Sequence, residues 1–383
     1  MNFRLGKRVI DPGKYFDYNA TTPICEAARE AWLLMADQHW ENPSSLYREA
    51  GIARRLLEDF REELAEEIGI EDAERVVFTS GATEANNAVI QFWSHAPGKI
   101  AISAVEHPSV RAAAAGFFGP ERMIEIGVDP ITGIINLEEV ERVVTMVEDL
   151  VGLSVMAANN ETGTIQPWDV IAELCLEAGI PYHSDSAQWI GKEPGGGFAD
   201  IDYFTGSAHK FGGPKGIGFL VLPENFDDCA FIGQLGGPQE NGRRGGTEDL
   251  PGIAAMIAAL KSQRNAPDVS DVRDLFEAAL LESGEFKIVG KRGPRLANTS
   301  MIVLPHTKNL KWLTRLSDRG FGVSTGSACS AGAGNPSQVM MSMDLEFEEM
   351  SRVLRVSGGP GQGEAEWMAL YDAIIGVKSE LED

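Results

Sequence analysis

Short apolar runs rich in β-branched residues recur along the first two thirds of the chain, with amphipathic stretches between them. Seven of these runs, between about residues 75 and 222, predict strands: RVVFTS, KIAISAV, MIEIGV, LVGLSVMAAN, IPYHSD, YFTGS and GIGFLVL. Strands that are covered on both faces by helices have such nearly continuous apolar sequences. The stretches between them have helical spacing, as in the apolar face formed by Leu57, Phe60, Leu64 and Ile68. The alternation predicts an α/β fold with a mostly parallel sheet between helices.

The same helical spacing predicts helices over residues 83–94 and 168–178. After about Pro251 the pattern changes. A long helical stretch (IAAMIAALKSQRN) leads to strand-like FKIVG and TSMIVL, and then to a helix (NLKWLTRLS), strand-like GFGVS and two more helices. This order predicts a smaller α+β domain with antiparallel strands. We therefore expect a large domain over residues 15–255 and a small domain made of residues 1–14 and 256–383.

Composition and charge exclude several classes of protein. The 383 residues are 43% hydrophobic and 23% charged, which is ordinary for a globular enzyme. No apolar run approaches the roughly 20 residues that span a bilayer, and the N-terminal segment has no apolar core of a signal peptide. A net charge of −24 opposes nonspecific binding to nucleic acid and to anionic lipid. We expect a cytoplasmic protein that binds neither nucleic acid nor membrane.

Cysteine usage points the same way. The four cysteines are Cys25, Cys175, Cys229 and Cys329, and none forms a CxxC pair. That spacing argues against a structural zinc site and is typical of a reducing compartment, so no metal is expected.

One lysine has a setting that suggests chemistry. Lys210 follows a predicted strand and enters a glycine-rich turn in SAHKFGGPKG. Alone, this motif is most simply an exposed loop. A lysine that forms a Schiff base needs partial desolvation to lower its pKa, and it needs a loop that a cofactor can approach closely.

Two further segments fit the same chemistry. Asp185 ends the preceding apolar strand, where it could pair with a pyridinium nitrogen or simply cap the next helix. The segment TSGATE, from Thr79, follows another strand and opens a helix whose free N–H groups could bind a phosphate. A plain capping box between Ser80 and Thr83 or Glu84 would explain it equally well.

Taken together and in this order, the segments resemble those of the class V aminotransferase family, and within it the cysteine desulfurases. The family has the aspartate-aminotransferase fold and uses pyridoxal 5'-phosphate (PLP). The resemblance runs from about Tyr15 to Gly358. It rests on DYNATTP, NPSS, SGATEANN, EHPS, NNETG, HSDSAQ, SAHKFGGPKGIG, GGPQENGRRGGTED, STGSACSAG and RVSG, which begin at residues 17, 42, 80, 106, 159, 183, 207, 236, 324 and 355.

The resemblance implies roles at the reacting end of the cofactor. Lys210 would hold PLP covalently and carry protons, and Asp185 would pair with the ring nitrogen. His107 would stack on the ring and act as an acid–base group near the substrate sulfur. Gln188 would bind the ring hydroxyl oxygen.

The phosphate and the substrate would have their own residues. The resemblance implies that the phosphate is held by Ala82, Thr83, Ser207 and His209. Thr247 would reach it from the neighbouring subunit, so that a homodimer shares its two sites. Asn160 would contact the cofactor and, with Arg355, bind the carboxylate of L-cysteine, since the guanidinium fork matches a carboxylate.

Cys329 decides the subfamily. It lies among small residues (STGSACSAGAG), where a mobile, accessible thiol can accept sulfur, whereas a structural cysteine has large apolar neighbours. Cys329 precedes Arg355 by 26 residues, which resembles the long-loop NifS/IscS-like subgroup that serves iron–sulfur cluster assembly and thiolation. Cys25, Cys175 and Cys229 receive no role, and Cys175 is expected to face the core.

The implied activity converts L-cysteine to L-alanine. Sulfur would become a persulfide on Cys329 and then pass to an acceptor protein, a scaffold or carrier. The alternatives are a selenocysteine lyase, another class V aminotransferase, or a binding protein that has lost catalysis. Two positions depart from the family pattern: Tyr47 replaces a usual histidine, and a glycine-rich run, 358–363, follows Arg355.

Overall fold

The structure is a computed structural model that describes residues 10–193, 198–226, 230–264, 267–326 and 337–382. Its main feature is a seven-stranded sheet in the order β1-β7-β6-β5-β4-β2-β3. The strands β3, β2, β4, β5 and β6 are parallel, and β7 runs antiparallel to both of its neighbours. Their bounds are Val76–Thr79 (β1), Lys99–Ser103 (β2), Met123–Ile126 (β3), Leu150–Ser154 (β4), Tyr182–Asp185 (β5), Tyr203–Ser207 (β6) and Gly218–Val221 (β7). Each lies in one of the seven predicted runs, so the predicted α/β sheet is confirmed.

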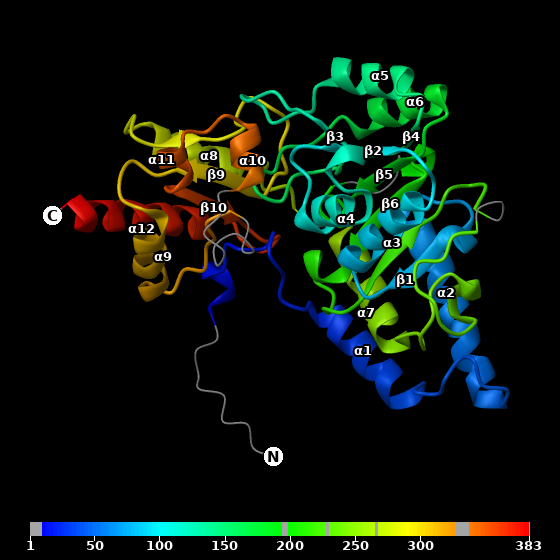
Figure 1. Ribbon diagram of the computed structural model, residues 1–383. Coiled ribbons are helices and arrows are strands. Elements are labelled where there is room, and N and C mark those ends of the chain that lie inside the picture. Colours follow the sequence, from blue (N-terminus) through cyan, green and yellow to red (C-terminus); the bar gives the residue numbers. More distant parts are fainter. Residues whose placement is uncertain (1–9, 194–197, 227–229, 265–266, 327–336, 383) are drawn as a thin grey trace.

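Helices cover both faces of this sheet (Figure 1). One face packs against α1, α2, α5, α6 and α7, and the other against α3 and α4. The bounds are Glu26–Gln38 (α1), Arg48–Ile68 (α2), Ala82–Ser94 (α3), Pro108–Phe118 (α4), Leu137–Met146 (α5), Trp168–Ala178 (α6) and Leu250–Gln263 (α7). Burial on both faces explains why most of the strand sequences are nearly continuously apolar rather than alternating.

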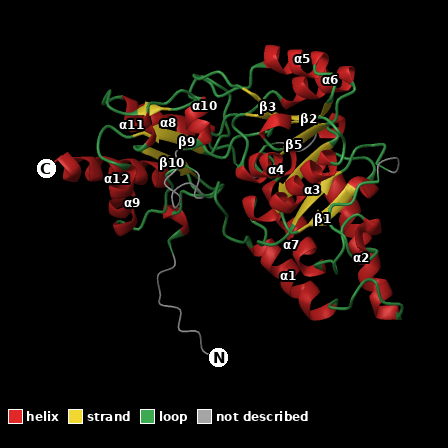
Figure 2. Cartoon of the chain, in the orientation of Figure 1, coloured by secondary structure: helices red, strands yellow, loops and turns green. Residues whose placement is uncertain are grey.

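A second, smaller unit is built on a three-stranded antiparallel sheet in the order β10-β9-β8 (Figure 2). Its strands are Lys287–Ile288 (β8), Thr299–Val303 (β9) and Val353–Ser357 (β10). Its helices are Ser270–Leu281 (α8), Asn309–Asp318 (α9), Gln338–Ser342 (α10), Phe347–Met350 (α11) and Glu364–Glu382 (α12). Short 3-10 turns occur at Pro12–Lys14, Ala73–Arg75, Pro120–Arg122, Phe198–Asp200, Ala208–Lys210 and Gln239–Gly242.

One predicted strand is wrong. The run GFGVS, residues 320–324, forms only isolated bridges, from Gly322 to Tyr15 and from Ser324 to Arg355. The third strand of the small sheet is instead VLRVS, Val353–Ser357, which was not predicted. This run is only five residues long and contains an arginine, so its local pattern is a weak strand signal. Its pairing with β9 is a tertiary contact that decides the assignment.

The N-terminal segment, residues 15–22, links the two sheets. It pairs with β10 through a bridge between Asp17 and Ser357. A few residues later Thr22 N donates to the carbonyl of His209, in the turn that carries Lys210. This segment therefore connects the small sheet to the end of β6, next to the turn that contains Lys210.

Within the described residues, no helix is both long and apolar enough to cross a membrane. The same part of the chain contains no cluster of three or more His, Cys, Asp and Glu side chains arranged to hold a metal ion.

The aromatic cluster under the small sheet generates a stability prediction. Trp367 is fully buried, and its ring meets Phe16 and Phe276 edge-on with both centroid separations at 5.2 Å. We expect Trp367→Ala to lower the free energy of unfolding by about 3–5 kcal/mol, because it leaves a large cavity. Urea unfolding followed by circular dichroism measures the loss. Leu310→Ala, at an exposed position of α9, is the control and should stay within about 0.5 kcal/mol of the parent. A loss below about 1 kcal/mol for Trp367→Ala would contradict the packing.

Candidate active site

The ends of three strands meet at one edge of the large sheet. Gly218 of β7 pairs with both Thr79, at the end of β1, and Ser207, at the end of β6. On the other side of β6, Asp185 at the end of β5 pairs with Thr205. The register therefore brings the predicted phosphate segment, Asp185 and the Lys210 turn to the same place.

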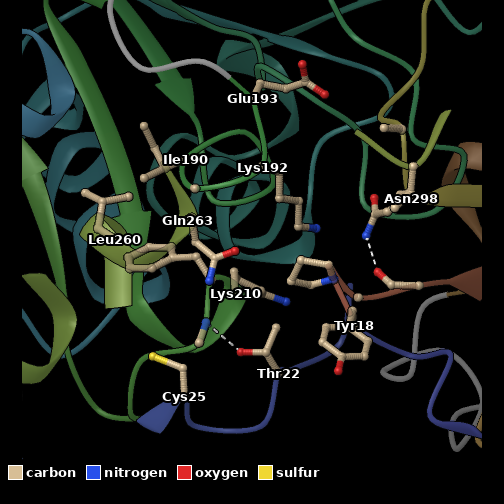
Figure 3. A pocket seen from close by; sticks show the side chains of 18 of the residues that line it. Tyr18, Thr22, Cys25, Ile190, Lys192, Glu193, Lys210, Leu260, Gln263 and Asn298 are labelled. Atoms are coloured by element: carbon tan, nitrogen blue, oxygen red, sulfur yellow. Dashed lines mark hydrogen bonds between the residues drawn. The ribbon is translucent and has the colours of Figure 1, made fainter. Parts of the chain in front are cut away.

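Lys210 lies in a 3-10 turn that follows β6 directly. Its ammonium donates to the backbone carbonyls of Asn19 at 2.7 Å and Ala20 at 3.1 Å. The side chain extends into a cavity of about 780 Å³ between the large sheet and the small sheet (Figure 3). The amine is thus partly desolvated and still open to a ligand, as a Schiff-base lysine requires.

Asp185 is a buried carboxylate, with 5% of its surface exposed. Its Oδ2 accepts from Asn86 Nδ2 at 2.7 Å, and its Oδ1 accepts from the N–H of Ala187 at 3.1 Å. The amide of Asn86 is itself oriented, because its Oδ1 accepts from Thr205 Oγ1 at 2.7 Å. These neutral donors hold the carboxylate in place and leave its charge available for a cationic ring nitrogen.

His107 begins α4 and is partly buried beside this carboxylate. Its Nδ1 accepts from the Ser109 N–H at 3.1 Å, which assigns the proton of the neutral ring to Nε2. Burial lowers the pKa of His107, the charge of Asp185 raises it and the charge of Lys210 lowers it, with a net lowering. The lowered pKa favours the neutral ring, which has an N–H donor at Nε2.

The start of α3 can hold a phosphate. Gly81 precedes the helix with φ of +144° and provides no side-chain cap for the first turn. A Cβ at Gly81 would lie 3.3 Å from Ser207 Oγ, so glycine lets the two strand ends approach each other. Ala82 and Thr83 open the helix, and the free N–H groups of a first turn favour an anion. Only one of the two hydrogen bonds of a capping box is observed: Glu84 Oε2 accepts from Ser80 N at 2.9 Å, and no side chain caps the first turn.

His209 lies beside Lys210 and contacts Thr21, with 3.2 Å between His209 Nδ1 and Thr21 Oγ1. Burial, followed by the charges of Lys210, Lys215 and Lys192, lowers the pKa of His209 to about 4. A neutral ring here would bind a phosphate by donating a hydrogen bond rather than as an ion.

These residues fit pyridoxal phosphate. The uncapped N-terminus of α3 suits the phosphate, the buried Asp185 suits the ring nitrogen, and the strand register brings both to the turn that carries Lys210. Asp185 and the start of α3 do not line the cavity, which Lys210 shares with residues of α7 and of the segment 358–361. Gln188, predicted to bind the ring oxygen, is buried next to Lys210, and its Nε2 donates to the Asn19 carbonyl at 2.9 Å.

Comparison with known proteins agrees with this geometry. The family model for class V aminotransferases matches residues 14–362. This chain belongs to the class V aminotransferase family. The family and its PLP-dependent fold are therefore confirmed as the motifs predicted.

Individual relatives narrow the comparison. The chain is 32% identical to a cysteine desulfurase of Gluconacetobacter diazotrophicus, over 96% of this chain and 94% of that protein. It is 35% identical to a cysteine desulfurase of Enterobacter agglomerans, over 90% of this chain and 87% of that protein. Among solved structures, a NifS-like protein from Rickettsia africae has a TM-score of 0.86 at 28% identity and covers 97% of this chain and 100% of its own.

Arg355, which is predicted to bind the substrate carboxylate, is held tightly. Arg355 on β10 is 2% exposed. Its NH2 donates to Asp17 Oδ1 at 2.7 Å and its NH1 to the backbone carbonyl of Asn160 at 3.0 Å. Its Nε lacks a hydrogen-bond partner within the described residues. The structure thus brings Asn160 and Arg355 together, as predicted for a carboxylate site.

The glycine-rich run after Arg355 has a steric reason. A Cβ at Gly359 would lie 2.2 Å from the ring of Tyr18. Gly358 and Asn298 exchange hydrogen bonds beside it, because Gly358 N donates to the Asn298 carbonyl and Asn298 Nδ2 donates to the Gly358 carbonyl. The ring of Tyr18 therefore occupies the space that a side chain at position 359 would need.

The remaining predicted residues have different outcomes. Thr247 is exposed, on the segment that leads into α7. Cys329 and Cys229 lie outside the described residues. Cys175 faces the core as predicted, and burial followed by the charge of Asp202 raises the pKa of its thiol to about 12. Cys25 is half-buried at the start of α1.

Three residues near the site were not predicted. Asn86 orients Asp185, Asn19 receives Lys210 and Gln188, and Lys192 donates to Asn19 Oδ1 at 2.7 Å. Asn86 and Asn19 lie inside the motifs SGATEANN and DYNATTP, so buried amides in these motifs were the available signal. Lys192 follows Gln188 by four residues, a spacing that places side chains together in a helical turn.

The charge of Asp185 should be visible in the titration of His107. Asp185→Asn removes the charge that raises the His107 pKa while burial and Lys210 continue to lower it, so we expect this pKa to fall further. NMR titration of the histidine ring signals in cofactor-free protein measures the change. Asp318→Asn, at an exposed position of α9, is the charge-matched control and should leave the His107 signal unchanged. An unaltered or higher His107 pKa in Asp185→Asn would contradict this arrangement.

Proposed function

We propose that this class V enzyme is a cysteine desulfurase that converts L-cysteine to L-alanine and moves the sulfur to Cys329 as a persulfide. The observation that carries the proposal is the meeting of Lys210, Asp185 and His107 at one sheet edge, in a chain similar over nearly its whole length to cysteine desulfurases. A solved structure of SspA in complex with cysteine is 27% identical, with a TM-score of 0.78 and coverage of 91% of this chain and 99% of its own. Bound PLP supplies an electron sink for bond cleavage next to the amino group.

Lys210 would hold the cofactor and move a proton at the substrate Cα. The carbonyls of Asn19 and Ala20 hold its ammonium in this structure, so the side chain is already directed into the cavity. His107 would direct its Nε2–H toward the substrate and assist proton movement near the sulfur. Asp185 would keep the ring nitrogen protonated, because a buried anion stabilises a neighbouring cation.

Arg355 and Asn160 would bind the substrate carboxylate. A carboxylate entering here meets a guanidinium that is already fixed by Asp17 and by the Asn160 carbonyl. Fixing the guanidinium beforehand reduces the entropy that is lost when the substrate binds. The carboxylate would share the Arg355 guanidinium with Asp17.

The segment that contains Cys329 is attached at this carboxylate site. On its N-terminal side, Ser324 exchanges two backbone hydrogen bonds with Arg355, at 3.1 and 2.7 Å. On its C-terminal side, Ser337 Oγ donates to Glu161 Oε2 at 2.7 Å, next to Asn160. Cys329 is three residues beyond Gly326, a reach of about 10 Å for extended chain. These attachments support a thiol that reaches the substrate sulfur.

The proposed mechanism predicts different losses of function for the variants Cys329→Ser and Lys210→Ala. Cys329→Ser should keep the absorption band of bound PLP and bind cysteine, but lose more than about 100-fold in alanine formation, since a hydroxyl is a poor nucleophile toward sulfur. Lys210→Ala should lose that band and the activity together. Wild-type protein treated with cysteine and no reductant should gain one sulfur mass on the Cys329 peptide. Cys25→Ser is the matched control and should keep normal turnover.

Two outcomes would contradict this mechanism. A persulfide on Cys25, Cys175 or Cys229 would reject Cys329 as the acceptor. Full alanine formation by Cys329→Ser would favour a selenocysteine lyase or another class V activity.

We further propose that the enzyme is a homodimer in which Thr247 contacts the phosphate in the other subunit. The segment before Thr247 is anchored to its own subunit, because Arg244 binds Glu84 with its Nε and NH2 at 2.8 and 3.2 Å. Glu240 in the same segment is buried against Arg61, at 2.7 and 3.0 Å. Two ion pairs therefore hold a segment whose end, Thr247, is directed to solvent in the single chain.

Exposed apolar side chains offer a surface for the second copy. They gather on α1, on the connection from α1 to α2, and in the segment after β7. Trp40 is 73% exposed, Leu46 97% and Leu235 84%. Large apolar residues at such exposure are unusual for a monomer and are typical of a subunit interface. A dimer would bury them, and the sulfur acceptor, a separate scaffold or carrier protein of the cytoplasm, would bind elsewhere.

A mixed dimer tests whether Thr247 acts across the interface. One chain carries Lys210→Ala and the other carries Thr247→Val. If Thr247 serves the neighbour, one site is fully intact and binds PLP like the parent. The Thr247→Val homodimer should bind PLP about tenfold more weakly, the effect of one lost hydrogen bond to a charged group. PLP titration measures both. Weak binding in the mixed dimer would show that Thr247 acts within its own subunit, and an active monomer in light scattering would reject the dimer.

A further inference from the structure

A second lysine lies in the same cavity as Lys210, and the reaction proposed above does not use it. Lys192 follows β5 in a turn, and Figure 3 shows its side chain extending into the cavity beside that of Lys210. The Lys192 Nζ donates to two amide oxygens, Asn19 Oδ1 at 2.7 Å and Gln188 Oε1. No ion pair joins it to a carboxylate in the described part of the chain. A lysine amine held between two amides, rather than paired with a carboxylate, calls for an explanation.

The bond to Gln188 fixes which end of that amide faces the cofactor. An amide side chain has an oxygen that accepts and a nitrogen that donates two hydrogens. Lys192 occupies the oxygen, and the Gln188 Nε2 donates one hydrogen to the Asn19 carbonyl at 2.9 Å. The second N–H hydrogen of Gln188 is left for a ligand. If the amide were reversed, its NH2 group would face the Lys192 donor, and its oxygen would face the ring oxygen of PLP. Both contacts would be repulsive, because they pair a donor with a donor and an acceptor with an acceptor.

We propose that Lys192 is a positioning residue that holds Gln188 with its N–H group toward the ring oxygen of the cofactor and so tunes the lysine-linked nitrogen. The proposal rests on the PLP-dependent function proposed above and deepens it. Lys192 itself need not touch the cofactor or the substrate. Its effect passes through the amide of Gln188.

Asn19 makes the arrangement rigid. Its backbone carbonyl accepts from both Gln188 and Lys210, and its Oδ1 accepts from Lys192. Its Nδ2 donates to Thr299 Oγ1 at 2.9 Å and to the Asn160 carbonyl at 3.2 Å. Because both ends of the Asn19 amide are occupied, it cannot rotate to accept Lys192 elsewhere. Lys192, Gln188 and Lys210 are therefore connected through one immobile residue.

The charges around Lys192 favour this role. Burial lowers the pKa of Lys192 well below its ordinary value, the charges of Lys210 and Arg355 lower it further, and Glu193 raises it. In its neutral form, the amine has two hydrogens, and the two amide oxygens match them. The two donated bonds thus persist whether the amine is charged or neutral.

The sign of the expected effect follows from electron density. A donor on the ring oxygen withdraws electron density from it and weakens the hold on the proton of the neighbouring lysine-linked nitrogen. Losing the donor, or losing a nearby positive charge, strengthens that hold. In Lys192→Met the pH midpoint of the PLP absorption change should therefore rise.

The experiment compares purified holoenzymes carrying Lys192→Met and Lys192→Arg with the parent. In Lys192→Met we expect the pH midpoint of the PLP absorption change to rise by about one unit, a tenfold change in proton affinity. Turnover at saturating cysteine should fall at least threefold, with KM within about twofold, since Arg355 still binds the carboxylate. Lys192→Arg retains a donor and should recover at least half of the midpoint shift. Lys291→Met, at an exposed site, is the control and should match the parent.

A double-mutant cycle tests the path through Gln188. If Lys192 acts by orienting this amide, Lys192→Met should add less than about 0.3 units to the midpoint shift of Gln188→Leu. Full additivity of the two shifts would overturn the proposal and leave Lys192 as an independent charge. An unchanged midpoint in Lys192→Met would also overturn it. If Lys192→Met does not fold, Lys192→Arg and Lys192→Gln give the same comparison. A protein that binds no PLP would instead reject the proposed function itself.

Discussion

The site depends on the burial of one polar residue, Asn19, between the two sheets. Its backbone carbonyl accepts hydrogen bonds from the Lys210 amine and the Gln188 amide, and its side chain joins Lys192 to Thr299 and to the Asn160 carbonyl. A buried amide costs free energy unless its hydrogen bonds are made, and here the described residues satisfy both ends of it. The small sheet can therefore occupy only a narrow range of positions relative to the lysine turn without breaking several of these bonds.

The rest of the site follows from that constraint and from the strand register. Gly218 sets the ends of β1 and β6 at one level, which brings the start of α3 close to the turn of Lys210. Asn86 connects the same helix to Asp185. The proposed cofactor-binding half is therefore built on the large domain, whereas the proposed carboxylate-binding half is brought by β10 and held through Asp17 and Asn19.

The cavity contrasts with the rest of the molecule. The chain carries a net charge of −24, yet Lys192, Lys210 and Arg355 lie close enough together for their charges to interact. Clustered cations favour anionic groups in their neighbourhood, such as a phosphate or a carboxylate. Asp17 holds Arg355, and Asp185 is reserved for the ring nitrogen in the function proposed here. The internal field therefore favours anionic ligands although the protein as a whole is acidic.

Local pattern was enough to predict much of the fold and part of the site. The seven strands were found because most strands covered on both faces are apolar over nearly their whole length. Asp185 was found because it ends such a strand, and Lys210 because it follows one and enters a glycine-rich turn. Strand β10 was missed, since five residues around an arginine become a strand only by pairing with β9. The sequence by itself thus determined the large sheet and the residues at its strand ends. Only the tertiary structure decided that Asn19 and Lys192 belong to the site, because their roles come from hydrogen bonds between segments that the chain separates by up to 338 residues.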